Sequence, residues 1–455
     1  MKRRVIYQVV TDRFAGSGGA QLNGLTRSGP ASRWMQFAGG NFEGLQARLS
    51  HVTRLGASAL WLSPIYHNSY LTAEKRKPRR DGYHGYWSRD FERLEPHFGT
   101  EQQLQSLLRA CHQHDIRPIL DVVLNHSNPT YSVDKGSLWR GGRMFARHSP
   151  DKDGCFHHLG FLDQRRSYDP YWWENGDVWN LADLAQENPR VRAYLREAHI
   201  KWLSFGFSGV RLDTALHLPA AYIREWKREM KAAVPGCDFF FGEWWNGGPH
   251  DEVSSGLSRE AGMPLTDFGL AHLLRMVVAG VSPLERLQEW VNYQEDYLEP
   301  DLKVNFLDNH DMPRLKNRLL DLGFSETQAD RRIELALILL MLWRGVPCLY
   351  YGIELGLFTR RRGPGKSWGH DPYNREPMRF PGAETPGMRL CSLLSGWRRE
   401  SDLVEHPLQW KDKGTRGAQL WRGPVRLEFR LSSKDELTAA SLYWKSESVW
   451  EREFR

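Results

Sequence analysis

The chain has 455 residues, 40% hydrophobic and 26% charged, a composition typical of globular proteins rather than disordered or fibrous ones. Its formal net charge is +7, but the basic runs at 75–80 and 360–362 are short and match no nucleic-acid-binding motif. We therefore interpret them as solvated surface and expect no nucleic-acid partner. The longest apolar run, 335–343, is too short to span a bilayer, so no membrane partner is expected either.

The N-terminus and the cysteines bear on the cellular compartment. MKRRVIYQVV enters strand-like sequence at once, without the apolar segment and cleavage site of a signal peptide. The five cysteines show no C-x-x-C spacing, and an odd number cannot all pair within one chain. A reducing compartment fits these features. The expected location is the cytoplasm, with a secreted mature form left open.

Strand-length apolar runs alternate with amphipathic helical stretches from the N-terminus onward. Strands are predicted at 5–10, 59–64, 117–126, 209–215, 238–245, 304–311 and 346–354. Helices are predicted at 41–56, 99–115, 188–206, 219–233, 282–294 and 331–343. A further strand near 263–268 would bring the units to eight. Repeated β-then-α units with strands apolar on both faces predict an α/β fold, a (β/α)8 TIM barrel.

Two regions interrupt this rhythm. Residues 127–187 are far too many for a βα loop and are expected to form an inserted domain B over the barrel mouth. After residue 401 strands replace the helical pattern, so 401–455 are predicted to form a small C-terminal β domain, sandwich-like in architecture. The barrel itself is predicted to comprise 1–126 and 188–400.

Polar residues cluster where the predicted barrel strands end. They are Asp121, Asn125 and His126 after the third strand, Arg211, Asp213 and His217 after the fourth, Glu243 after the fifth, and His310 and Asp311 after the seventh. The carboxyl ends of barrel strands open at one mouth, where barrel enzymes keep their active sites. We therefore expect these side chains to converge there.

The residue types at these positions suit glycoside cleavage. Arg211 and Asp213 lie two apart and share a strand face, so the guanidinium would lower the carboxyl pKa, as a nucleophile requires. For this Arg-x-Asp pattern alone, a satisfied internal ion pair is the alternative. Glu243, flanked by aromatic residues in FFFGEWWNG, is expected to have its pKa raised by desolvation, as a general acid requires. Such carboxylates can cleave a glycosidic bond through an oxocarbenium-like transition state.

Four segments resemble the motifs of the α-amylase family, in its order and spacing. They are DVVLNH (121–126), GVRLDTALH (209–217), FFFGEWWNG (239–247) and NFLDNHD (305–311). The resemblance extends from the first strand to about residue 400 and is nearest to cyclodextrin glucanotransferases and maltogenic amylases. It implies a retaining double displacement on α-linked glucans, a structural calcium ion, a domain B and a C-terminal β domain.

The resemblance also implies roles for matching residues. Asp213 matches the nucleophile, Glu243 the acid/base, and Asp311 the third carboxylate that holds sugar hydroxyls. The residues matching sugar-contacting positions are Arg211, His126, His310, Tyr86, His84, Asp371 and Arg375. Asn125, Asp183 and the backbone carbonyl of His217 match calcium ligands, and Ca²⁺ accepts such oxygen donors. A hydrogen-bonded polar cluster without metal is the alternative at these last positions.

Hydrolysis of α-1,4-glucosidic bonds is the predicted activity, with α-glucan oligosaccharides as substrate. A transglycosylase that passes the glucosyl group to a sugar hydroxyl is the first alternative, and a non-catalytic glucan-binding barrel the second. The second is disfavoured because all three carboxylate positions are filled. Leu216 stands where many amylases have a lysine, so acceptor-side binding is expected to differ. No appended starch-binding domain is recognised, which favours soluble maltodextrins. The oligomeric state is left open.

Overall fold

The structure is a computed structural model of the chain. It describes residues 1–22, 31–72, 79–160, 180–293, 299–361, 371–414, 417–432 and 436–454.

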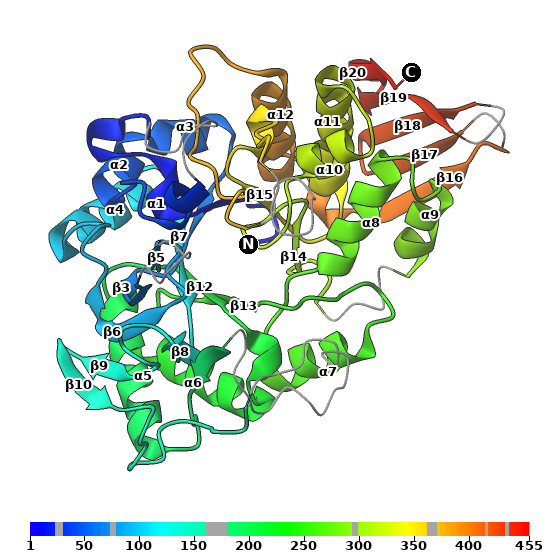
Figure 1. Ribbon diagram of the computed structural model, residues 1–455. Coiled ribbons are helices and arrows are strands. Elements are labelled where there is room, and N and C mark those ends of the chain that lie inside the picture. The colour runs from blue at the N-terminus through cyan, green and yellow to red at the C-terminus, as the bar shows by residue number, and fades with distance from the viewer. Residues whose placement is uncertain are drawn as a thin grey trace.

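Seven parallel strands curl into the barrel sheet. In chain order they are β1 (Ile6–Val9), β2 (Ala59–Leu62), β7 (Arg117–Val122), β12 (Gly209–Leu212), β13 (Phe239–Gly242), β14 (Val304–Phe306) and β15 (Val346–Tyr350). Their spatial order is β13-β12-β7-β2-β1-β15-β14. The predicted strand near 263–268 is reduced to two parallel bridges, Leu265 with Gly242 and Thr266 with Val304. These bridges link the two edge strands, so the sheet nearly closes and the predicted barrel is confirmed (Figure 1).

Helices surround this sheet. They are α2 (Phe42–Ala47), α3 (Leu49–Arg54), α4 (Glu101–Gln113), α5 (Pro189–Leu203), α6 (Ala220–Ala233), α7 (Glu252–Ala261), α8 (Phe268–Val278), α9 (Glu285–Asn292), α10 (Leu315–Asp321), α11 (Glu326–Leu342) and α12 (Pro386–Glu400). Capping boxes fix the starts of α4, at Thr100 with Gln103, and of α11, at Ser325 with Gln328. The helix predicted at 41–56 is two helices, which meet at Arg48.

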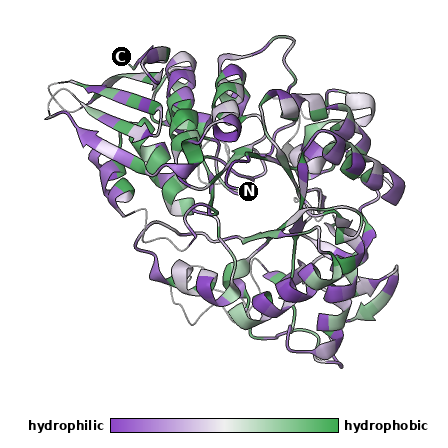
Figure 2. Ribbon diagram, turned by 180° about the vertical axis from the view of Figure 1, so that it is seen from behind, coloured by the Kyte–Doolittle hydropathy of each residue, from purple (hydrophilic) through white to green (hydrophobic). Residues whose placement is uncertain are grey.

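The barrel interior is apolar at its base and polar at its mouth. Inward-facing residues such as Ile6, Ile119, Phe241 and Val304 form one buried cluster, and hydrophobic residues dominate the barrel strands in Figure 2. Because alternate residues of a strand share a face, the next inward positions toward the carboxyl ends carry the polar side chains. A buried polar layer at the barrel mouth thus lies directly above a buried apolar cluster, which we call the apolar floor.

Short strands cover the mouth beside β7. Strand β8 (His126–Pro129) pairs antiparallel with β11 (Leu181–Asp183). Strands β9 (Leu138–Arg140) and β10 (Arg143–Ala146) join β6 (Ser88–Leu94) and β3 (Tyr66–Asn68) in a four-stranded sheet. The segment predicted as domain B therefore shares a sheet with residues that precede it. Its bounds, 127–187, stay a prediction, and residues 161–179 lie outside the described part.

The C-terminal strands form one sheet in place of the sandwich-like arrangement predicted. Strands β16 (Leu408–Asp412), β17 (Ala418–Arg422), β18 (Val425–Leu431), β19 (Leu437–Trp444) and β20 (Glu447–Glu453) follow one another as an antiparallel meander. Barrel helices cover its apolar face: Trp397 of α12 stacks on Trp444 at 4.5 Å between ring centroids, and Trp450 Nε1 donates to Glu334 of α11 at 2.7 Å. Because helices cover this face, a second sheet is not needed to bury it.

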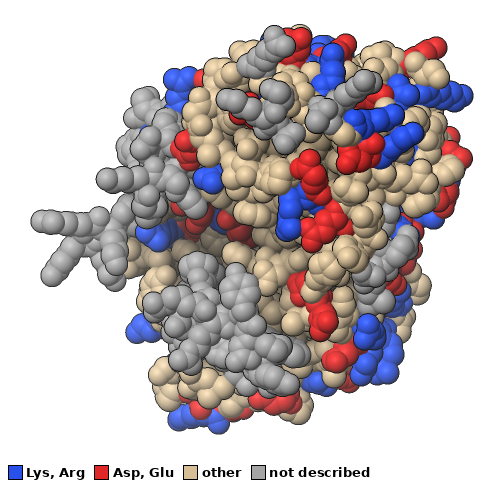
Figure 3. Space-filling model, turned by 90° about the vertical axis from the view of Figure 1, so that its right-hand side faces the viewer, with Lys and Arg blue, Asp and Glu red and all other residues tan. Residues whose placement is uncertain are grey.

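Among the described residues, no helix is both long enough and apolar enough to cross a membrane. All five cysteines are buried and unpaired. On the face drawn in Figure 3, the described Lys and Arg side chains alternate with Asp and Glu rather than forming one broad basic area.

Arg422 of β17 fastens the C-terminal sheet to the barrel. Its buried guanidinium donates to the carbonyls of Leu342 and Trp343 at the end of α11, at 3.0 and 2.9 Å. It also donates to the carbonyls of Val404 and His406, both at 3.1 Å. The carbonyls at the end of α11 lack intrahelical partners, and Arg422 donates to them and complements the negative end of the helix dipole. Arg398 adds a longer contact to the carbonyl of Trp343, at 3.4 Å.

We predict that Arg422→Met lowers the free energy of unfolding by about 2–4 kcal/mol, because buried carbonyls lose their donors. Urea denaturation measures the change. The matched control is Arg430→Met on β18, whose exposed guanidinium pairs with the exposed Glu451 and should contribute less than about 1 kcal/mol. Equal losses in the two variants would contradict this account of the junction.

Candidate functional site

The guanidinium of Arg211 lies at the centre of the polar layer. Its Nη1 donates to Asp121 Oδ1 at 2.8 Å and to Asp213 Oδ1 at 2.7 Å, and its Nη2 lies 2.5 Å from Glu243 Oε1. Strand register brings these groups together, because β12 lies between β7 and β13, with Arg211 opposite Asp121 on one side and Phe241 on the other. One cation thus faces three carboxyl groups in a buried place.

Burial, together with this charge imbalance, determines the protonation of Glu243 and Asp121. Burial raises the pKa of Glu243 to about 8, and Arg211 only partly offsets it. Burial likewise raises the pKa of Asp121 to about 7. Glu243 therefore holds its proton at neutral pH, the direction expected from the sequence. Its surroundings differ from that expectation, since Arg211 and the backbone N–H of Thr214, 2.9 Å from Oε2, contact it in addition to apolar groups.

Asp311 lies on the opposite side of the mouth with a second guanidinium. Arg375 Nη2 is 3.2 Å from Asp311 Oδ1, and Arg375 Nη1 is 3.1 Å from Asp371 Oδ1. Burial raises the pKa of Asp311, although 23% of its side chain remains exposed. Asp371 is mostly exposed, at 59%, so it reaches the mouth only through Arg375.

Tyr86 and three histidines form an aromatic wall. Tyr86 stacks on His310 with ring centroids 4.9 Å apart and planes 3° apart, and on His84 at 5.7 Å. His126 Nε2 lies 3.9 Å from Asp213 Oδ2. Burial lowers the pKa of His84, His126 and His310, so all three imidazoles are neutral at pH 7. Neutral imidazoles and a ring face suit hydroxyl-bearing ligands rather than anions.

The structure shows the contacts of Asp121, which was expected at the mouth without an assigned role, and adds Gln8, which was not predicted. Asp121 Oδ2 accepts from Tyr86 Oη at 2.7 Å and from Trp61 Nε1 at 2.9 Å, so it ties the aromatic wall to Arg211. Gln8 Nε2 lies 2.8 Å from His310 Nδ1. For both Asp121 and Gln8, the feature in the sequence that could indicate a role is a polar residue at an inward position of an otherwise apolar strand.

Backbone pairing brings two of the predicted metal ligands, Asn125 and Asp183, near each other. The N–H of Leu184 donates to the carbonyl of Asn125 at 2.9 Å, which brings Asp183 to the end of β7. His126 lies close enough to His217 to add to the lowering of its pKa, which burial dominates. His157 Nδ1 lies 2.9 Å from Asp183 Oδ2. Within the described ranges, no three His, Cys, Asp or Glu side chains form a metal-binding group.

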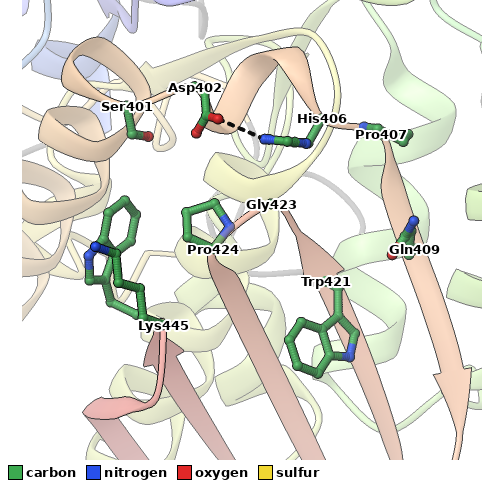
Figure 4. A pocket seen from close by; sticks show the side chains of 10 residues that line it. Ser401, Asp402, His406, Pro407, Gln409, Trp421, Gly423, Pro424 and Lys445 are labelled. Atoms are coloured by element: carbon green, nitrogen blue, oxygen red, sulfur yellow. Dashed lines mark hydrogen bonds and ion pairs between the residues drawn. The ribbon is translucent and has the colours of Figure 1, made fainter.

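A groove of about 630 Å³ lies elsewhere, between the end of α12 and the C-terminal sheet (Figure 4). Trp421, Trp444 and His406 line it, and none of the polar residues of the barrel mouth does. Each indole already packs one face against the protein, Trp421 under Arg426 and Trp444 on Trp397. The convergence of charges in the barrel, rather than this groove, identifies the candidate site.

Known proteins are similar to this chain over most of its length. A family model described as alpha amylase, catalytic domain, matches residues 8–419. The chain is 32% identical over 416 residues to a cyclomaltodextrin glucanotransferase of Bacillus licheniformis, covering 88% of this chain and 54% of that protein. The chain thus spans about half the length of the curated relatives it matches.

Two solved structures are similar over nearly the whole chain. CldA, described as a cyclomaltodextrin glucanotransferase with a three-domain ABC distribution, is 27% identical with a TM-score of 0.81, covering 96% of this chain and 89% of that one. The α-amylase of Geobacillus thermoleovorans, solved with acarbose, is 27% identical with a TM-score of 0.74, covering 95% and 87%.

We predict that Arg211→Met lowers the free energy of unfolding by about 3–5 kcal/mol at neutral pH, because it leaves buried carboxylates without their cation. The loss should grow as pH rises, since the carboxyl groups remain neutral in acid and must ionise in alkali. Thermal melts of both proteins across pH measure it. A loss independent of pH would show that Arg211 acts through packing alone.

Proposed function

The chain belongs to the α-amylase family, and on that premise we propose that it cleaves α-1,4-glucosidic bonds of maltodextrins with retention of configuration. The observation that carries the proposal is Arg211 joined to both Asp213 and Glu243, with Glu243 kept protonated by burial. A carboxyl nucleophile beside a protonated acid is what a retaining glycosidase requires.

In the first step, Asp213 attacks the anomeric carbon as the bond to the leaving oxygen breaks. Glu243 gives its proton to that oxygen, so the leaving sugar departs as a neutral alcohol and a glucosyl ester forms on Asp213. In each step Arg211 stabilises the negative charge on Asp213 or Glu243, both of which it contacts. Asp311, held by Arg375, accepts hydrogen bonds from sugar hydroxyls, and Tyr86 supplies a flat face for the ring.

In the second step, the ionised Glu243 takes a proton from water, whose oxygen attacks the anomeric carbon. The ester bond to Asp213 breaks, and Glu243 regains its starting proton. Two displacements at one carbon restore the original configuration.

Transglycosylation is the second candidate. Similarity to a cyclomaltodextrin glucanotransferase supports it. In that reaction a sugar hydroxyl would replace water as the group that attacks the anomeric carbon in the second step. Leu216, partly buried against the core, stands on the acceptor side in this proposal and offers no polar group to an incoming sugar.

We also propose that Asn125, Asp183 and the carbonyl of His217 hold a structural Ca²⁺. Oxygen donors from separate segments suit this ion, and the side-chain nitrogen of Asn125 is buried without a partner among the described residues, so its amide is free to turn its oxygen inward. His157 beside Asp183 is the competing internal cation. A bound ion would tie domain B to the barrel and leave the chemistry to the carboxyl groups.

Incubation with maltoheptaose, followed by chromatography, tests the proposed reaction. We predict short linear maltooligosaccharides, and a rate lowered by at least about three orders of magnitude in Asp213→Asn, because the covalent step is lost. Cyclic or lengthened products would favour the second candidate. Near-normal turnover of the variant, with an unchanged melt, would remove Asp213 from the nucleophile's role.

The pH dependence of kcat/KM tests the acid. Because the pKa of Glu243 is raised to about 8, the proton is held below that pH and lost above it. We predict that kcat/KM falls roughly tenfold per pH unit in the alkaline range beyond this value. The residual activity of Glu243→Gln should lack this limb. A decline that already begins near pH 5 would contradict the assignment.

Chelation tests the metal. If calcium joins domain B to the barrel, EDTA should lower the melting temperature, and added Ca²⁺ should restore it in a concentration-dependent way. Magnesium, which prefers to keep its water ligands, should restore it poorly. A melt that EDTA leaves unchanged would favour the cluster stabilised by His157.

A further inference from the structure

Gln8 is a buried amide among apolar residues of the barrel interior. Ile6, the preceding inward residue of β1, belongs to the apolar cluster, and Gln8 itself is only 2% exposed. Its Nε2 lies 2.8 Å from His310 Nδ1. Burial of an amide costs free energy unless the group is hydrogen-bonded, so the contact with His310 offsets part of the cost of burying the Gln8 side chain.

The amide nitrogen of Gln8 fixes the direction of that hydrogen bond. An amide nitrogen carries two hydrogens and accepts none, so it donates to Nδ1 of His310. A neutral imidazole whose Nδ1 accepts carries its own hydrogen on Nε2. His310 Nε2 lies 3.2 Å from Asp311 Oδ2, while Arg375 contacts the other oxygen of that carboxyl group.

The charged groups around the ring keep it neutral. Burial, together with the guanidinium groups of Arg375 and Arg211, lowers the pKa of His310 well below its usual value. Tyr86 stacks on its face, and His84 is a neighbour of Tyr86, with ring centroids 5.7 Å apart. Asp311 is the anion at its edge.

Other contacts hold His310 in place without selecting a tautomer. Its backbone carbonyl accepts from Asn374 Nδ2 at 2.6 Å and from Arg375 Nε at 2.8 Å. The Tyr86 ring sets the plane of the imidazole. None of these contacts distinguishes Nδ1–H from Nε2–H, whereas the Gln8 amide touches Nδ1 directly.

We propose that Gln8 is a positioning residue that locks His310 in the Nε2–H tautomer. Nε2–H then donates to the oxygen of a sugar hydroxyl, and Asp311 accepts the hydrogen of the same hydroxyl, so His310 and Asp311 bind one hydroxyl group together. This contact with substrate rests on the proposed function, whereas the tautomer of His310 does not.

Nitrogen NMR of protein labelled with ¹⁵N-histidine tests the tautomer without substrate, with the His310 signals identified by their loss in His310→Asn. In the wild type we expect an unprotonated Nδ1 and a protonated Nε2 at neutral pH. Gln8→Glu replaces the donor by an acceptor, so the Nδ1 signal should shift to its protonated position. Gln8→Met, of similar length, should leave a mixture of tautomers.

Kinetics with maltoheptaose test the consequence. Both Gln8 variants should lose about tenfold or more in kcat/KM, the usual cost of removing a group that orients an active-site histidine. The matched control is Ile6→Val, on the same face of β1 but away from His310, which should stay within about twofold of the wild type.

Three results would overturn the proposal: a protonated Nδ1 in the wild type, wild-type tautomers in both Gln8 variants, or equal kcat/KM in Gln8→Met and Ile6→Val. A wild type that does not cleave maltoheptaose would refute the proposed function instead, and the NMR result would still decide the tautomer.

Discussion

A single buried guanidinium is the constraint on which the polar layer depends. Arg211 contacts Asp121, Asp213 and Glu243, and its own positive charge can balance only one of them. The low dielectric of the interior makes a second and third negative charge costly, so protons must supply the remaining neutrality. Burial beside a single shared cation keeps Glu243 protonated, and the proposed chemistry uses that proton.

The barrel makes the imbalance possible. The apolar floor under the site excludes water, which strengthens each electrostatic contact and raises the pKa of Glu243. Backbone register, rather than flexible loops, places Arg211 between β7 and β13. Rigid strands can hold opposing charges at hydrogen-bond distance, whereas a solvated loop would let them separate.

The sequence predicted those parts of the fold that depend on local periodicity. The succession of strand-length and helix-length patterns predicted the barrel, and the two-residue period of a strand predicted the shared face of Arg211 and Asp213. Helix α8 was missed because it is apolar on nearly every side, which hides the helical period. The contact between Arg211 and Glu243 was also missed, because it depends on the pairing of two strands that lie some thirty residues apart in the chain. Gln8 and His310 meet only when the barrel closes.

Carboxyl ¹³C NMR of Glu243 across pH tests the central claim most directly, with the signal assigned by its absence in Glu243→Gln. A side chain kept protonated by burial, with one cation shared among three acids, should titrate near pH 8 in the free protein. A midpoint close to the ordinary glutamate value of 4.5 would mean that Glu243 is ionised at neutral pH, and the account of the site would fail.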